Sequence, residues 1–388
     1  MAKNPDIPAE KTRAIPEQVR CLLWGRCAGR CEWCNRPVSY HPRSKEAVNL
    51  AEAAHIIGFS KAGPRGEQDL SDELARDIDN LMLLCRLCHK TIDTNHAQYP
   101  VDRLRRMKHA HEQRIERVTA IGQERESHIL LYGANIGEHS SPVSYRTAAL
   151  ALVADERYPA RDVLELGMIN SSFRDRTSQF WQIEAEHLRA MVQQQVRPRL
   201  TNGHIQHLSI FALAPQPLLS LLGYLLCDIY YDAQVYQLHR EPAGWAWQGH
   251  PAGFTYIVEE PAGAQGPPAL VLALSATVTD DRILQVLGDN AAVWRVTIPR
   301  PDNDFLKSAQ QLQQFRQTIR PLMDRIKARH GQGTLLHVFP AVPVSIAVEF
   351  GRIIMPKADM PLRFYDQNKD LGGFVYALDI NTPNGGTQ

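Results

Sequence analysis

Two Cys-x-x-Cys pairs, Cys31-Glu-Trp-Cys34 and Cys85-Arg-Leu-Cys88, stand 50 residues apart in the first quarter of this 388-residue chain. A two-residue spacer turns the backbone back on itself, so each pair can present two thiolates to one tetrahedral metal ion. No secretory signal opens the chain, and paired cysteines in a reducing compartment hold metal more often than they form disulfides. We therefore predict a cytoplasmic protein with a structural Zn²⁺ site, in which four protein ligands leave no open position for catalysis.

The length of the chain predicts more than one domain. Residues 1–125 carry 21 Lys and Arg against 17 Asp and Glu, and this mild basicity permits a polyanionic partner. The apolar run 208–227 contains Pro215, Gln216 and Pro217, so it predicts a buried strand and helix and no membrane span. We expect one domain at 1–125 and a second at 126–388.

Residues suited to hydrolysis lie between and just after the cysteine pairs. His55 ends an apolar segment, and Asn80 precedes the apolar run 81–84. His89 and Asp93 are four residues apart at the start of an expected helix, so both lie on one face and can chelate one cation. Phosphodiester hydrolysis needs a base that deprotonates water and a divalent cation that neutralises charge on the phosphate. A neutral imidazole is suited to be that base.

This order of residues resembles the HNH endonucleases, whose ββα-metal fold places His, Asn and His on two strands and a helix. The resemblance covers residues 20–120. It implies that His55 is the general base and that Asn80 orients the imidazole or the loop around it. It also implies that His89 and Asp93 bind a catalytic cation, Mg²⁺ or another divalent ion.

The sequence departs from the family pattern at one position. Many members have Asp or His immediately before the base, whereas Ala54 stands there. Glu52 shares the strand face of position 54 and is either a further metal ligand or part of a surface salt bridge. The long loop 56–79 either touches DNA phosphates or is a flexible insertion. Nothing in this region resembles a module that reads bases, so we expect cleavage of double-stranded DNA with little sequence preference.

Residues 101–125 are expected to form an amphipathic helix that closes the first domain, with Leu104, Met107 and Ile115 close to one face. His109 and His111 belong to this charged helix, and we expect both to be solvated. Beyond it, short apolar runs alternate with helical stretches, notably 176–196 and 303–329. This alternation predicts an α/β domain with a largely parallel sheet.

The second domain contains an internal repeat. Residues 210–223 align without a gap with residues 338–351, and the segment 235–237 falls opposite 363–365. The matching pairs are 128 positions apart: Phe211 with Phe339, Pro215 with Pro343, and Gly223 with Gly351. These residues either recur by chance at strand-to-helix turns or mark a duplicated α/β half, with two sheets related by a pseudo-two-fold axis. The duplication explains the constant spacing better.

The duplicated region resembles the SAVED domain, a fused pair of Rossmann-like (CARF-like) halves that senses cyclic oligonucleotides. The matching residues are the two repeated blocks and the strand 270–276 between them. HNH followed by SAVED resembles the effector nucleases of CBASS anti-phage systems. The resemblance implies a cyclic dinucleotide or oligonucleotide activator, pseudo-repeats at about 145–260 and 265–388, and a homo-oligomer that assembles further on activation.

Ligands of open α/β sheets lie beyond the carboxyl ends of the strands. A cyclic nucleotide also needs aromatic faces for its bases and cations for its phosphates. The candidate ligand-binding residues are therefore Tyr158, Phe173, Arg174, Trp181, Ser275 and Tyr365. For each of them, a place in the core or on the surface is the alternative.

Two other functions remain open from the sequence. One is a restriction-type HNH endonuclease whose C-terminal domain recognises DNA. The other is a catalytically inactive zinc module that only binds DNA. An endonuclease gated by a second messenger agrees best with the order of the two domains.

Overall fold

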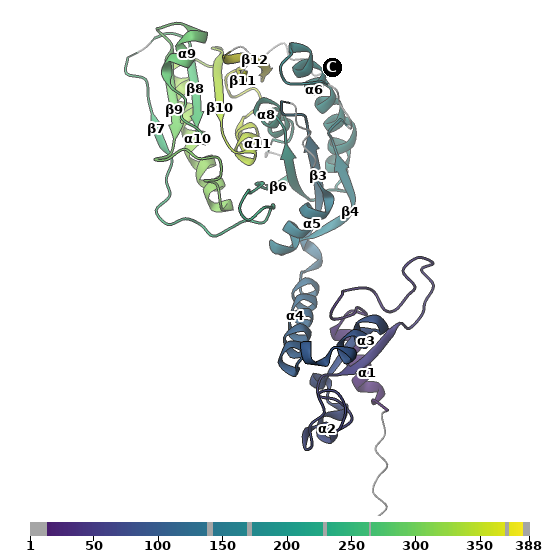
Figure 1. Ribbon diagram of the computed structural model, residues 1–388. Helices are drawn as coiled ribbons and strands as arrows, with labels where there is room; N and C mark the ends of the chain where they lie inside the picture. Colours follow the sequence, from purple (N-terminus) through teal and green to yellow (C-terminus); the bar gives the residue numbers. More distant parts are fainter. Residues whose placement is uncertain are drawn as a thin grey trace, which may run out of the picture. The chain divides into compact units, whose positions relative to one another are not determined.

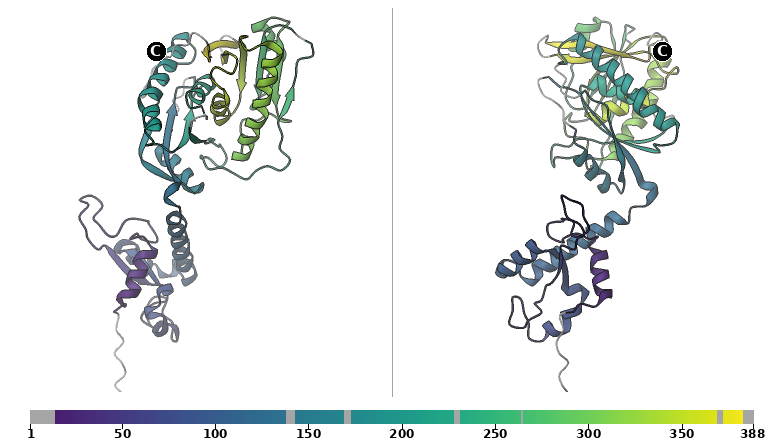
Figure 2. Two further views of the ribbon diagram at one scale, coloured as in Figure 1. Left: turned by 180° about the vertical axis from the view of Figure 1, so that it is seen from behind. Right: turned by 90° about the vertical axis from the view of Figure 1, so that its right-hand side faces the viewer.

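The computed structural model describes residues 14–137, 143–168, 173–227, 231–263, 265–368 and 372–382 (Figures 1 and 2). The chain divides between Gly122 and Gln123 into two compact units. Both contain helices and strands, which confirms the mixed α/β class. In the described ranges, no helix has the length and hydrophobicity needed to cross a bilayer.

The first unit is built on a two-stranded antiparallel sheet followed by a helix. Strand β1 (Ala51–His55) pairs with β2 (Leu81–Cys85), so that His55 lies opposite Leu81, and α3 (Arg86–Thr94) follows β2 directly. All five residues of β2 are buried, and its side chains form a core with Leu23 of α1 (Glu17–Arg26) and Ile92 of α3. This is the strand–strand–helix order that the sequence predicted.

The segment between the two strands contains more structure than the sequence indicated. A short helix, α2 (Leu70–Glu73), is followed by 3-10 turns at Leu74–Arg76 and Ile78–Asn80. The second turn ends at Asn80, immediately before β2. The expected loop 56–79 is thus partly helical, and the turns deliver Asn80 to the start of the strand.

Helix α4 (Val101–Thr119) packs on the turn that carries the first cysteine pair. Its Lys108 amine lies 4.0 Å from the buried Glu32 carboxylate and 2.6 Å from that of Glu112. Burial raises the pKa of the Glu32 carboxyl, and Lys108 opposes that rise. His111 is only 5% exposed and lies 3.3 Å from the carbonyl oxygen of Cys27, so the expectation that it is solvated was wrong.

The second unit contains two sheets. The first has four parallel strands in the order β4-β3-β5-β6, namely β3 (Glu126–Gly133), β4 (Tyr158–Glu165), β5 (His207–Leu213) and β6 (Asp232–Val235). The second has six strands in the order β12-β11-β10-β8-β9-β7: β7 (Ile257–Glu259), β8 (Pro268–Ala273), β9 (Ala292–Thr297), β10 (Leu336–Ala341), β11 (Leu362–Asn368) and β12 (Gly373–Ile380). Strands β7 and β12 are antiparallel additions at its edges.

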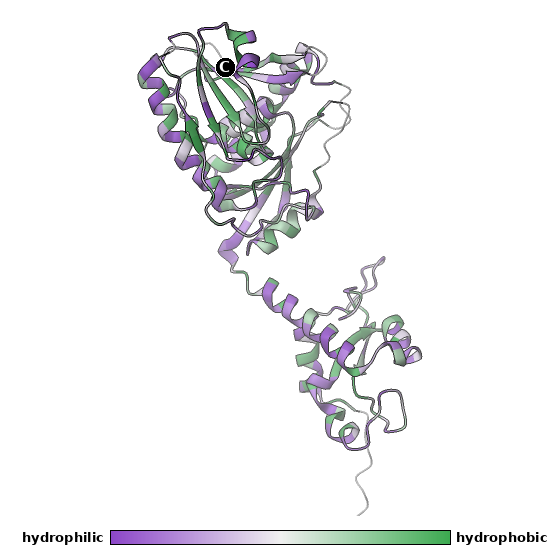
Figure 3. Cartoon of the chain, turned by 60° about the vertical axis from the view of Figure 1, so that its left-hand side comes forward, coloured by the Kyte–Doolittle hydropathy of each residue, from purple (hydrophilic) through white to green (hydrophobic). Residues whose placement is uncertain are grey.

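Helices connect and cover these strands: α5 (Tyr145–Ala154), α6 (Ser178–Met191), α7 (Arg197–Thr201), α8 (Gln216–Leu225), α9 (Asp280–Leu287), α10 (Ala309–His330) and α11 (Val344–Ile353). Helices α8 and α11 lie between the two sheets (Figure 1). Apolar residues run along the strands of this unit, whereas α4 of the first unit is mostly hydrophilic (Figure 3).

The internal duplication is visible in the strand order. The parallel strands β9-β8-β10-β11 repeat the arrangement β4-β3-β5-β6, so each half has the order second, first, third, fourth. Pro215 and Pro343 occupy the same place, as the residues that precede α8 and α11. The first half begins with β3, and therefore earlier than residue 145, where its start was expected. Strand β7 lies within the range expected for the first half, but it joins the second sheet.

The alignment of the repeats shifts by one residue after the helices. Tyr236 stacks on Phe211 with ring centroids 4.4 Å apart, and Tyr365 stacks on Phe339 at 4.6 Å. Phe211 and Phe339 are 128 positions apart, but the two tyrosines are 129 apart. The gapless alignment at 235–237 was therefore wrong by one residue, because the segment that connects α11 to β11 is longer.

Candidate metal centre and active site

The four cysteines come together at the edge of the first unit. Cys31 and Cys34 lie in a turn after α1, Cys85 ends β2, and Cys88 lies in the first turn of α3. Their sulfur atoms all lie within 4.8 Å of one another, and those of Cys34 and Cys85 are 3.9 Å apart. A zinc–sulfur tetrahedron has edges of about 3.8 Å, so this set fits zinc. In the described part of the chain, no other group of three or more His, Cys, Asp or Glu donors is as close.

His55 ends β1 with its ring fixed by a backbone carbonyl. Its Nε2 lies 3.0 Å from the carbonyl oxygen of Ala75. A carbonyl oxygen can only accept, so Nε2 carries the proton and the neutral ring has its lone pair on Nδ1. The turn at residues 74–76 therefore selects one tautomer of His55, and this tautomer can accept a proton from water.

Asn80 is 5% exposed and holds the segment that follows His55. Its Oδ1 accepts from the backbone amide of Ile57 at 2.8 Å. Its Nδ2 donates to the carbonyl oxygens of Ile57 and Leu74, both at 3.1 Å. Asn80 thus ties the end of β1 to the turn that holds the His55 ring, which makes it a residue that orders the loop.

His89 stands between two carboxylates. Its Nδ1 lies 2.7 Å from Oε2 of Glu52 on β1, and its Nε2 lies 3.3 Å from Oδ2 of Asp93, one turn later on α3. If Nδ1 donates to Glu52, the neutral ring presents its Nε2 lone pair to an oxygen of Asp93. Two electron-pair donors at this distance need a proton or a cation between them. Adjacent ligands of an octahedral Mg²⁺ are about 3 Å apart, so His89 and Asp93 fit such an ion.

Arg65 is a residue of the site that the sequence did not single out for it. Its side chain is 6% exposed, and its Nη2 donates to Oδ1 of Asp93 at 2.8 Å. Its Nε donates to the carbonyl oxygen of Ile56 at 3.0 Å. The guanidinium therefore connects the loop after β1 to the helix that carries the candidate cation ligands. No local spacing signals this contact, since Arg65 and Asp93 are 28 positions apart.

A pocket of about 330 Å³ joins these side chains, lined among others by His55, Arg65, His89 and Asp93. Ala54 stands where many HNH enzymes have another metal ligand. It is 3% exposed, packs in the core and offers no ligand atom to the pocket. Glu52 is not in the pocket lining: its carboxylate contacts His89 and also lies 3.4 Å from the Arg86 guanidinium, which is the surface salt bridge that the sequence left open. A carboxylate that binds the second nitrogen of a metal-ligating imidazole is a common supporting arrangement.

The six candidate ligand residues of the second unit lie on or after different elements: β4, α6, β8 and β11. Trp181 and Tyr365 are 3% and 7% exposed, so most of each side chain is packed in the core, although Trp181 also lines a pocket of about 600 Å³. The Tyr365 hydroxyl contacts Nδ1 of His337, and Trp181 packs on Phe180. Tyr158 begins β4, at the amino end of the parallel sheet, and donates to the carbonyl oxygen of Gln123.

Phe173, Arg174 and Ser275 do follow the carboxyl ends of parallel strands. Phe173 and Arg174 come after β4, and an Arg174 guanidinium nitrogen donates to the carbonyl oxygen of Phe173 at 3.1 Å. Ser275 comes two residues after β8, and its amide donates to the carbonyl oxygen of Ala341 at 2.7 Å. These three residues remain candidates for ligand binding.

Comparison with protein families gives two matches. Residues 31–94 match the model of the HNH endonuclease family. Residues 188–380 match the model described as the SMODS-associated and fused to various effectors sensor domain, SAVED. No curated protein matches the chain.

Similar solved structures are distant. The Cap4 SAVED/CARF-domain containing receptor of Acinetobacter baumannii, solved with the cyclic trinucleotide 2'3'3'-cAAA, has 14% identity and a TM-score of 0.44, with 80% of this chain and 65% of that chain covered. The corresponding receptor of Moraxella osloensis has 12% identity and a TM-score of 0.41, with 72% and 60% covered. The chain thus spans 65% and 60% of the length of these receptors. Likeness at this level assigns neither a ligand nor an activity.

Proposed function

Because the chain joins an HNH endonuclease domain to a SAVED sensor domain, we propose that it is a metal-dependent DNA endonuclease switched on by a cyclic oligonucleotide. It acts in the cytoplasm as an effector of CBASS-type anti-phage defence and degrades double-stranded DNA with low sequence specificity. Residues 1–125 form the nuclease and residues 126–388 form the sensor, as two halves. The observation that carries the nuclease part is the convergence of His55, His89 and Asp93 on one pocket.

In the proposed reaction, each residue has a separate task. His55 removes the proton from the attacking water at Nδ1, because Nε2 is already committed to Ala75. Asn80 keeps the His55 ring in place because it binds Ile57, just after His55, and Leu74, in the turn that contacts the ring. His89 and Asp93 would hold the catalytic cation, and Glu52 fixes the His89 ring so that Nε2 faces Asp93.

The catalytic cation, when bound, would supply positive charge beside the scissile phosphate and the leaving oxygen. A zinc ion held by the four cysteines would be structural, because its ligand set would be complete. It would join the turn at residues 31–34 to β2 and α3, the elements that carry or precede the reactive side chains. Loss of zinc would thus disorder the site without removing a reacting group.

Activation by a messenger requires that the messenger bind the active state more tightly than the inactive one. We propose that this state is a homo-oligomer in which two nuclease centres act on the two strands of one duplex. Light scattering with and without a saturating activator tests this step. An unchanged mass in the presence of an activator that switches on cleavage would contradict it.

Plasmid digestion with Mg²⁺ and a panel of cyclic di- and trinucleotides tests the function. The expected result is cleavage that depends on one cyclic nucleotide in the wild type and is absent in His55→Ala. Cleavage without any nucleotide would instead favour the restriction-type endonuclease. Equal plasmid integrity with wild type and His55→Ala across the whole panel would leave a module that only binds DNA.

A further inference from the structure

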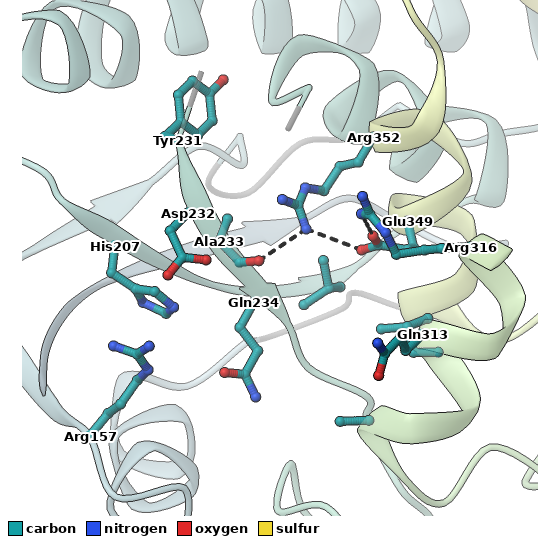
Figure 4. A pocket seen from close by; sticks show the side chains of 13 residues that line it. Arg157, His207, Tyr231, Asp232, Ala233, Gln234, Gln313, Arg316, Glu349 and Arg352 are labelled. Carbon is teal, nitrogen blue, oxygen red and sulfur yellow. Dashed lines mark hydrogen bonds and ion pairs between the residues drawn. The ribbon is translucent and has the colours of Figure 1, made fainter. Parts of the chain in front are cut away.

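The second unit contains a groove of about 610 Å³ beside the edge strand β6 (Figure 4). Arg157 precedes β4, His207 begins β5 and Asp232 begins β6, so this part of the lining comes from the amino ends of three parallel strands. Tyr231, further residues of β6, and residues of α10 and α11 from the other half complete the lining. The groove is therefore separate from the carboxyl ends of the strands, where the sequence placed the ligand.

One side of the groove holds two arginines that share a single carboxylate. Arg352 is 4% exposed and lies 3.2 Å from Oε2 of Glu349, while Arg316 pairs with Oε1 of the same residue. Arg352 also donates to the carbonyl oxygen of Ala233 on β6 at 3.1 Å. Figure 4 shows both guanidinium groups beside Glu349. Among the described lining residues, three arginines stand beside two carboxylates, Asp232 and Glu349.

A third arginine lies on the other side of β6. Figure 4 shows the Arg157 side chain near His207. Within the ranges that the structure describes, no hydrogen bond or ion pair of the Arg157 side chain is found, and its Nε is buried without a partner. Burying a guanidinium N–H without an acceptor costs free energy, which a bound anion would recover.

The pKa of His207 reflects the charges that surround it in the groove. Burial and, after it, the charges of Arg157 and Arg352 together lower the pKa of His207 to about 4, and the charge of Asp232 opposes this shift. His207 is thus neutral near pH 7, and its Nδ1 contacts the Ser127 hydroxyl at 2.8 Å. The positive charge of the groove therefore comes from arginines, which stay charged at all physiological pH values.

We propose that this groove binds the phosphate or phosphodiester group of a small nucleotide-like ligand. Guanidinium groups match phosphate oxygens in shape and charge, and a volume of about 610 Å³ is in the range of small-molecule sites. The ligand is either the activating cyclic oligonucleotide or a separate phosphate-bearing metabolite. Only the first of these sources rests on the proposed function, and neither requires that the protein cleave DNA.

Two variants of the full-length chain test the groove without removing a partner of a buried charge. Arg157→Gln removes the arginine that has no partner. Gln313→Glu adds a negative charge from an exposed position on α10 in the groove lining. Arg161→Gln is the control, because Arg161 is exposed on β4 and does not line the groove. Circular dichroism and melting temperature check that all three variants fold.

Isothermal titration calorimetry with inorganic phosphate, adenosine 5′-monophosphate, a cyclic dinucleotide and a cyclic trinucleotide gives the readout. We expect at least tenfold weaker binding in Arg157→Gln and Gln313→Glu, and unchanged binding in Arg161→Gln. Weakening limited to the cyclic nucleotides identifies the groove as the messenger site, and weakening limited to phosphate or the mononucleotide identifies a separate site. The proposal is overturned if no probe binds the wild type at millimolar concentration, or if both variants bind every probe as the wild type does.

Discussion

Gly223 of α8 and Gly351 of α11 lie at the crossing of the two helices, each against the backbone of the other. A β-carbon on Gly223 would collide with the carbonyl oxygen of Val348, and one on Gly351 would collide with the carbonyl oxygen of Ser220. Ser220 and Val348 are themselves 128 positions apart, as are the two glycines. The contact is thus symmetric, and the Ser220 hydroxyl reinforces it by donating to the carbonyl oxygen of Ala347 at 3.1 Å.

The close helix crossing predicts that even a methyl group at either glycine lowers the stability of the second unit. Gly223→Ala or Gly351→Ala should destabilise the second unit by about 3 kcal/mol or more, because the collision is with backbone that cannot rotate away. Thermal unfolding measures the loss. Gly249→Ala is the control, since nothing lies within 4 Å of the added carbon there. Equal melting temperatures for all three variants would mean that the helices do not cross at their glycines.

The cysteine cluster predicts about one tightly bound zinc per chain. Cys88→Ser should lower the zinc content and destabilise the first unit, because a three-ligand site loses affinity and the ion joins three parts of the fold. Elemental analysis and circular dichroism measure both effects. Cys21→Ser is the control, because Cys21 is exposed on α1 outside the cluster. A zinc-free but folded wild type would contradict the assignment.

His55 predicts a loss of chemistry without a loss of fold. His55→Ala should reduce the cleavage rate about 10²- to 10⁴-fold, the range typical of a general base, with DNA affinity retained. Plasmid digestion and a DNA-binding assay measure the two quantities separately. His96→Ala, at an exposed histidine of the same unit, should cleave as the wild type does. Equal losses in the two variants would remove His55 from its role.

The Glu52–His89 contact predicts weaker cation binding. Glu52→Gln should raise the Mg²⁺ concentration needed for half-maximal cleavage about 10- to 100-fold, because the His89 ring loses the carboxylate that fixes its orientation. Higher Mg²⁺ should restore much of the rate, and calorimetric titration with Mn²⁺ should give the same shift. Glu73→Gln is the control, because Glu73 is exposed on α2. A lower maximal rate at unchanged half-saturation would contradict a role in holding the cation.

Glu184 predicts a dependence of stability on pH. It is 1% exposed on α6, neither carboxyl oxygen has a partner among the described residues, and burial raises its pKa to about 7. Below about pH 4.5 the group is protonated in both the folded and the unfolded chain, so it adds no pH-dependent penalty. Between about 4.5 and 7 the unfolded chain releases the proton first, and stability falls as pH rises.

Glu184→Gln should remove this dependence. The difference in melting temperature between Glu184→Gln and the wild type should be a few degrees larger at pH 8 than at pH 5. This follows from a conversion of roughly 2–4 °C per kcal/mol. Differential scanning calorimetry at the two pH values measures the change. Glu165→Gln, exposed on β4, is the control. A constant difference between Glu184→Gln and wild type at both pH values would show that the carboxyl does not titrate in this range.

Much of the local structure could be read from the sequence. The strand expected at 270–276 corresponds to β8, and the apolar run 208–227 contains β5 and α8, because short apolar runs bounded by turn residues signal strands. The helix pattern placed α4 as well, but its end came earlier than expected, at Thr119. The error at His111 has a tertiary cause: whether a histidine on a charged helix is solvated depends on what packs against it.

The tertiary structure decided the partners of the side chains. Glu52 meets His89 because the β1–β2 register and the direction of α3 bring residues 37 positions apart into contact, and neither is encoded in local spacing. Tyr365 is an aromatic residue of the kind that stacks on ligand bases, but it stacks on Phe339 in the core. The register of β11 decides which face of the sheet its side chain occupies. The arginine groove exists only because β6 is an edge strand beside helices of the other half.

The sequence by itself determined the elements whose signal is short in range: the two cysteine pairs, the helical spacing of His89 and Asp93, and the repeat at 128 positions. Only the tertiary structure decided which charges meet, which aromatic rings are buried, and where a pocket opens. The physical reason is that spacing and periodicity act through neighbouring backbone, whereas contacts between distant residues depend on the register and packing of whole elements.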